Sequence, residues 1–116
     1  MKTKVSSRLY LEDILSAIAR IGEYTAKGKE DFFAHGLVQD GVIRQLSIIG
    51  EAATKLPMSL KTKHPEIPWK EVTAMRNIIV HDYSEINLER IWETIERDLP
   101  VLKKAIEMML KDGISF

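Results

Sequence analysis

Apolar residues recur at alternating spacings of three and four along most of this chain, which is the period of an α-helix with one buried face. Val42, Leu46, Ile49, Ala53 and Leu56 show the pattern most clearly. The strict alternation of apolar and polar residues that marks a half-buried β-strand is almost absent. The sequence therefore predicts an all-α fold.

The ends of the first main helix are marked by residues with known preferences. We expect it to run from about Arg8 to Ala26, with Ser6 or Ser7 as its N-cap and Gly28 as its stop. A polar connector follows, and the two aromatic residues after it, 32 and 33, form either a brief helical turn or the anchor of a loop.

Three further helices account for the rest of the pattern. The second is expected to open near Asp40 and to end by Pro57. Residues 61–68 contain two prolines and are expected to connect it to a third helix that begins at Trp69. Asn87 is a good N-cap for the last helix, which we expect to be kinked at Pro100 because proline lacks an N–H and clashes with the preceding turn. Four helices with short connecting turns favour an antiparallel four-helix bundle.

Composition limits the class of protein. The 116 residues are predicted to form a single domain, 45% of them apolar and 29% charged, as in a soluble globular protein. No cysteine is present, which excludes disulfides and thiolate metal sites and suits the reducing cytoplasm. No signal sequence or membrane span is apparent. With 17 basic and 17 acidic residues the net charge is zero, which argues against broad charge-driven binding of nucleic acid but permits a grip on a few phosphates.

One short segment carries groups suited to chemistry on a phosphate. Arg76 and His81 are separated by four residues, and Asp82 and Tyr83 follow directly. Arginine can grip a phosphate with two parallel hydrogen bonds. Histidine, with an unperturbed pKa of about 6.5, can both accept and donate a proton near neutrality. These are the functions needed to cleave a phosphodiester.

The spacing of this pair poses a geometric problem. At about 100° per residue, positions five apart on a helix point about 140° away from each other. Either the helix loosens near Val80, so that His81 can swing round, or a twofold partner supplies the complementary residue and two copies of the motif build one cleft. We expect a contribution from both.

RNA cleavage without a metal is the chemistry that these groups fit best. The RNA strand supplies its own nucleophile, the 2′-hydroxyl. His81 could remove that proton, a second donor could protonate the leaving 5′-oxygen, and Arg76 could stabilise the charge that develops on the phosphate. The expected products are a 2′,3′-cyclic phosphate and a 5′-hydroxyl, and DNA should survive.

Several other residues have two interpretations. Asn77 could orient a phosphate or hold a helical turn, and Asp82 could steer the imidazole or be a solvated loop carboxylate. Glu51 is expected to form a structural ion pair with Arg76 or Arg44. The two tryptophans, 69 and 92, are expected in the core or at a dimer seam rather than as platforms for bases. The three histidines show no metal-ligand spacing, so neither a metal site nor a cofactor is expected.

With these residues identified, the chain resembles the HepT-type toxins of the HEPN superfamily over essentially its whole length. The segment 75–83 matches the family pattern of arginine, four residues, histidine, one residue and tyrosine. Residues 48–53, Ile-Ile-Gly-Glu-Ala-Ala, resemble the family's second-helix signature, and Ile91-Trp92 followed by Leu99-Pro100 resembles its last helix.

The resemblance implies a dimeric helical bundle that cleaves RNA with Arg76 and His81 as catalytic residues. It also implies a partner, a small nucleotidyltransferase antitoxin of the MNT type that transfers AMP from ATP to Tyr83. An adenylyl group there would place bulk and negative charge two residues from His81. The alternative is a binding module that holds a nucleotidyltransferase or a nucleotide without cleaving RNA, and a third possibility is a purely structural bundle.

Overall fold

The structure, a computed structural model, describes residues 4–78 and 87–113. Within those ranges it is helical and contains no strand, which confirms the all-α prediction. The elements, in chain order, are α1 (Lys4–Tyr24), α2 (Lys29–Ala34), α3 (Gly36–Thr54), α4 (Met58–Lys63), α5 (Trp69–Ala74), the 3₁₀ turn η1 (Met75–Ile78), α6 (Leu88–Glu93), the π-helical turn η3 (Thr94–Asp98) and α7 (Leu99–Asp112).

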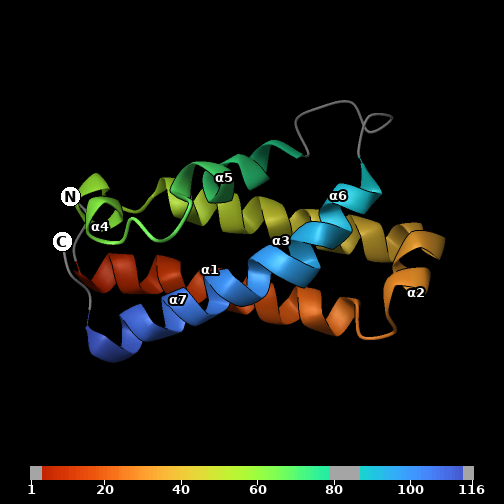
Figure 1. Ribbon diagram of the computed structural model, residues 1–116, viewed down its shortest axis with the longest axis horizontal. Helices are drawn as coiled ribbons and strands as arrows, with labels where there is room; N and C mark the ends of the chain where they lie inside the picture. The colour runs from red at the N-terminus through yellow and green to blue at the C-terminus, as the bar shows by residue number, and fades with distance from the viewer. Residues whose placement is uncertain (1–3, 79–86, 114–116) are drawn as a thin grey trace.

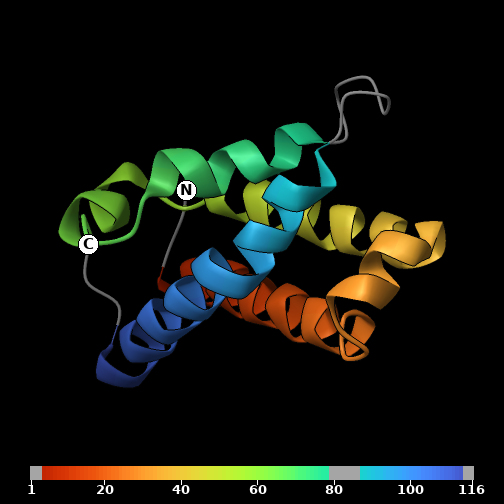
Figure 2. The same cartoon turned by 45° about the vertical axis from the view of Figure 1, so that its right-hand side comes forward.

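The long segments lie along one another in alternating directions. α1 packs against α3, and α7 packs against α1 (Figures 1 and 2). α5 and η1 lie along the other side of α3, so that α3 contacts both the first helix and the segment that carries Arg76. α3 is therefore the element that links the candidate site to the core.

The buried face of each helix carries the apolar pattern of the sequence. All five residues of the pattern from Val42 to Leu56 are buried, the last of them just after the end of α3, and Ile14 and Ile21 of α1 are fully buried. α7 contributes its own apolar stripe, which comprises Leu99, Leu102, Ile106 and Met109. Burial of this kind stabilises the fold by roughly 25 cal/mol per Å² of apolar surface removed from water.

The start of α1 differs from the sequence prediction. The helix begins at Lys4 rather than Arg8, and Ser7 lies inside it with no exposed surface, so the prediction of a serine N-cap is wrong. α1 ends at Tyr24, before Ala26, and Gly28 has φ +95°, a conformation that suits glycine. The helix extends past Ser7 because Leu11 and Ile14, four and seven residues further on the same face, are fully buried against the core.

The start of α3 and the presence of α4 also differ from the sequence prediction. α3 begins at Gly36, ahead of Asp40, and helix α4 covers part of the segment expected to be a connector. Leu60, which is fully buried, anchors α4 to the core. A single apolar anchor is too little for a periodic pattern to appear in a helix of six residues.

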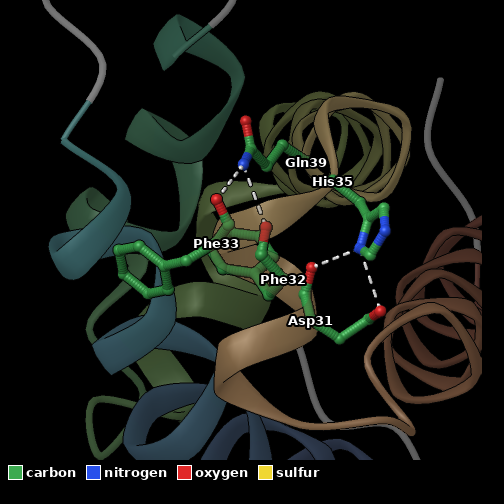
Figure 3. A network of polar contacts seen from close by, with 5 residues as sticks. All are labelled: Asp31, Phe32, Phe33, His35 and Gln39. Carbon is green, nitrogen blue, oxygen red and sulfur yellow. Dashed lines mark hydrogen bonds and ion pairs between the residues drawn. The ribbon is translucent and has the colours of Figure 1, made fainter.

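The corner between α2 and α3 is held by polar contacts to the backbone (Figure 3). The Gln39 amide donates to the carbonyls of Phe32 (2.9 Å) and Phe33 (3.3 Å). The Nδ1 atom of His35 lies 3.0 Å from both the carbonyl and the carboxylate of Asp31. Of the two predictions for the aromatic pair, the helical turn is therefore confirmed, and Phe32 is fully buried within it.

The last helix begins at the predicted cap. The Asn87 side chain accepts a hydrogen bond from the amide of Arg90 at 3.2 Å. The helix then continues through the π turn η3, in which the Leu99 N–H bonds the Thr94 carbonyl five residues back. Because Pro100 has no N–H and crowds the carbonyl four residues before it, a widened turn suits this position.

Candidate functional site

Arg76 lies in η1, directly after α5. Its neighbours Val72 and Met75 are buried and fix this end of the segment to the core. The Arg76 side chain is 45% exposed, and Asn77 is exposed beside it. The core therefore presents the guanidinium of Arg76 at the surface, where a phosphate could reach it.

The guanidinium has a partner on the neighbouring helix. Nη1 of Arg76 lies 3.8 Å from Oε2 of Glu51 in α3, and the Glu51 side chain is 55% exposed. Of the two partners predicted for Glu51, the structure selects Arg76 over Arg44. An exposed ion pair of this kind stabilises a protein by about 0–1 kcal/mol. Glu51 can therefore orient Arg76 without preventing a phosphate from displacing it.

The backbone of Arg76 is also fixed by a close approach of the two elements. A Cβ atom built on Gly50 would lie 2.3 Å from the backbone nitrogen of Arg76 and 2.8 Å from the Thr73 carbonyl oxygen. It would also lie 2.9 Å from the Arg76 Cβ. Only a residue without a side chain allows α3 to lie this close to η1. Gly50 therefore sets the distance between Arg76 and the core.

The role of Gly50 was missed in the sequence, although a signal was present. A glycine inside a regular apolar helix weakens that helix relative to alanine and often marks a close packing contact. The sequence could not identify Arg76 as the residue that contacts Gly50, because the apolar period of a helix does not determine which segment packs against it.

The remaining predicted site residues, His81, Asp82 and Tyr83, lie outside the described residues. The structure thus brings together Arg76, Glu51 and Gly50, and leaves the pairing of Arg76 with His81 as a prediction. The described start of the motif is not a regular α-helix. The α-helix gives way to a 3₁₀ turn over Met75–Ile78, so α-helical angles do not hold for Arg76 and Asn77.

In the described segments no group of three or more histidine, cysteine, aspartate or glutamate side chains could hold a metal ion. His64 contacts a local carboxylate instead, with Nδ1 3.5 Å from Oε2 of Glu66. Among the helices described, none combines the length and apolar character that a membrane crossing requires.

Similarity to known proteins extends over most of the chain. Residues 14–109 match the family described as ribonuclease HepT-like. A protein of Thermococcus cleftensis named probable ribonuclease HepT is 42% identical over 109 residues, which cover 93% of this chain and 99% of the relative. A protein of Caldanaerobacter subterraneus named putative RNase is 39% identical over 90% of this chain and 94% of the relative.

One relative is about twice as long as the matched region, and its name includes a second activity. The Methanocaldococcus jannaschii protein named gamma-glutamylcyclotransferase and putative RNase is 42% identical over 106 residues, and the match spans 90% of this chain but 48% of the relative. No solved structure matches the chain. The family match covers most of the chain, including Gly50, Glu51 and the Arg76–Tyr83 motif. The chain therefore belongs to the HepT-like ribonuclease family of the HEPN type.

Proposed function

We propose that the chain is a metal-independent endoribonuclease, acting as one domain over residues 1–116. The observation that carries the proposal is the family match over residues 14–109, within which Arg76 is fixed by Gly50 and kept at the surface. Relatives named as ribonucleases support the same activity.

Each catalytic role follows from the chemistry of its group. His81 would act in proton transfer between the 2′-hydroxyl, the phosphate and the leaving 5′-oxygen, and Arg76 would stabilise the additional negative charge on the phosphoryl oxygens. Glu51 would hold the guanidinium until the substrate phosphate displaces it. Asn77 is exposed next to Arg76, which suits a role in orienting the phosphate. Asp82 would steer the imidazole.

A homodimer would complete the cleft. On a regular α-helix Arg76 and His81 would point about 140° away from each other. Whatever angle the 3₁₀ turn at Met75–Ile78 adds, a second copy would supply the complementary group and double the local positive charge. The neutral net charge of the chain is consistent with a need for such a local concentration of cations.

The proposed biological role is that of a toxin in the cytoplasm, neutralised by a nucleotidyltransferase antitoxin of the MNT type. The phenol oxygen of Tyr83 would attack the α-phosphorus of ATP, lose its proton and displace pyrophosphate, which leaves AMP on the tyrosine. The added phosphate would repel the RNA backbone beside His81.

The test is RNA cleavage by purified protein in the presence of EDTA. The unmodified protein should release fragments with 2′,3′-cyclic phosphate and 5′-hydroxyl ends and should leave DNA intact. His81→Ala and Arg76→Ala should each abolish cleavage while circular dichroism shows an unchanged helical fold. Intact RNA after incubation with wild-type protein would favour the alternative, a non-catalytic module that binds a nucleotidyltransferase or a nucleotide.

Mixed dimers test whether the cleft is shared. In a dimer of one Arg76→Ala and one His81→Ala subunit, a cleft built across the interface retains one site with both groups intact. If both groups come from one subunit, neither site is complete. Recovery of cleavage on mixing the two inactive variants is therefore expected, and its failure in a verified mixed dimer would exclude a shared cleft.

A further inference from the structure

Helix α5 separates two surface hollows of opposite charge. On one side, a groove is lined by Glu66, Glu71 and Asp98 with a single cation, Arg90, over an apolar floor. On the other side, a hollow of about 410 Å³ is lined by Met58, Lys61, Thr62, Trp69, Lys70 and Thr73, and no carboxylate is among these residues. A chain with zero net charge thus has a local basic hollow beside the segment that carries Arg76.

The basic hollow and the candidate site meet at one residue of α5, Thr73. Thr73 lines the hollow, and its carbonyl oxygen belongs to the contact between Gly50 and the Arg76 backbone. Trp69 begins α5 and Arg76 lies in η1 just after its end, about 10 Å further along at a helical rise of about 1.5 Å per residue. A ligand that reaches from the hollow to Arg76 would have to be extended.

The indole of Trp69 is held in a defined position. Its Nε1–H donates to the His64 carbonyl at 3.0 Å, and the half-buried ring packs against the core. Because its only polar group is already used, the part of Trp69 that lines the hollow can offer a ligand only its aromatic surface. Aromatic surfaces of this kind stack with nucleobases of any sequence.

We propose that this hollow holds a single-stranded segment of the RNA substrate, with one base against Trp69 and a backbone phosphate beside Lys70, and that the strand continues along α5 to Arg76. The proposal rests on the ribonuclease function proposed above. The predicted packing of Trp69 against the core still holds, and the proposal adds a use for the part of the ring that lines the hollow. Charge decides which side of α5 the strand takes, since the opposite groove carries three carboxylates that would repel phosphates.

The first test measures binding of a fluorescently labelled, fully 2′-O-methylated RNA strand, which lacks the nucleophile and stays intact. Lys70→Glu is expected to weaken binding about tenfold at low salt and to reduce the slope of log K against log salt by about 0.7, the value for one lost phosphate contact on a single strand. Lys70 is exposed, so the variant should fold normally.

Lys104→Glu is the matched control, because it makes the same change in charge at an exposed site on α7. It should change affinity less than about twofold, because Lys104 does not line the hollow and its charge is screened by salt. Equal losses in the two variants would mean that only net charge matters and would overturn the proposal.

The second test uses the fluorescence of Trp69 in a Trp92→Phe background, where it is the only tryptophan. Saturating RNA should quench this emission, and Trp69→Leu should weaken binding while it keeps an apolar group against the core. Unchanged emission at saturation would overturn the placement of a base on Trp69.

Cleavage of unmodified RNA separates this proposal from the ribonuclease function. Lys70→Glu should raise KM with little effect on kcat, whereas Arg76→Ala should lower kcat. Active Lys70→Glu protein with wild-type KM would refute the strand path and leave the ribonuclease function intact. A wild-type protein that binds the methylated strand through Lys70 but cleaves no RNA would refute the ribonuclease function alone.

Discussion

Gly50 and the backbone of Arg76 are in such close contact that no side chain fits between them, since a Cβ on Gly50 would lie 2.3 Å from the Arg76 nitrogen. Gly50→Ala should therefore push η1 away from α3. We expect a loss of about 1–3 kcal/mol in the free energy of unfolding, as for other overpacked sites. Urea denaturation measures this change, and RNA cleavage should fall with it because Arg76 is displaced.

Gly22 provides the matched control for this prediction. It lies in α1, and a Cβ there would meet nothing within 4 Å. Gly22→Ala should stabilise the protein by about 0.5–1 kcal/mol because alanine is the better helix former. A Gly50→Ala protein as stable as Gly22→Ala would contradict the close contact.

The Glu51–Arg76 ion pair is expected to matter more for substrate than for stability. Glu51→Gln should change the free energy of unfolding by about 1 kcal/mol or less, because both side chains are about half exposed. RNA affinity should rise about two- to threefold, since a phosphate no longer competes with a carboxylate for Arg76. Glu93→Gln removes a similarly exposed pair with Arg90, at 3.9 Å, and should leave RNA affinity unchanged.

Arg76→Lys separates charge from geometry at the same position. Lysine keeps the positive charge but loses the planar fork that can hold two phosphate oxygens. We expect kcat/KM for RNA cleavage to fall about tenfold or more, the equivalent of one lost charge-assisted hydrogen bond. Wild-type kinetics in this variant would show that Arg76 acts only through its charge.

The Asn87 cap holds the start of α6, the first described residues after the motif segment. Asn87→Ala removes the acceptor for the Arg90 amide and should cost about 1 kcal/mol of stability, whereas Asn87→Ser should retain most of it. Thermal unfolding of the two variants side by side measures the difference. Equal melting temperatures would mean that solvent replaces the cap at no cost.

Phe32 joins the α2 corner to the last helix. It is fully buried, and its ring centroid lies 5.4 Å from that of Trp92 in α6. Phe32→Ala should destabilise the protein by about 3–5 kcal/mol. The half-buried Phe33 is the control, and its truncation should cost clearly less. Unfolding followed by tryptophan fluorescence reports on both variants.

The main features of the fold could be predicted because they depend on local signals. The apolar period of α3 and the Asn87 cap are each set by residues close in sequence, and both are confirmed. The Ser7 cap and the absence of α4 were wrong because tertiary burial decided them. Ser7 faces the core, and Leu60 alone attaches α4.

The candidate site could be predicted in part. The types of residue in the motif indicated phosphate chemistry, and Glu51 was expected to pair with Arg76 or Arg44. The choice between these partners depends on the path of a distant segment, which no local pattern encodes. The same is true of Gly50, whose contact with η1 joins positions 26 residues apart in the chain.

The order of two neighbouring residues on α5 helps to decide which side of the helix is basic and which is acidic. Lys70 lines one hollow and Glu71 the other, so transposing them would keep composition, mass and isoelectric point identical. In the transposed protein the lysine would face the acidic groove, and the glutamate would face the basic hollow. Overall composition would not reveal the change, but a polyanion that approaches the hollow would meet a carboxylate in place of a cation.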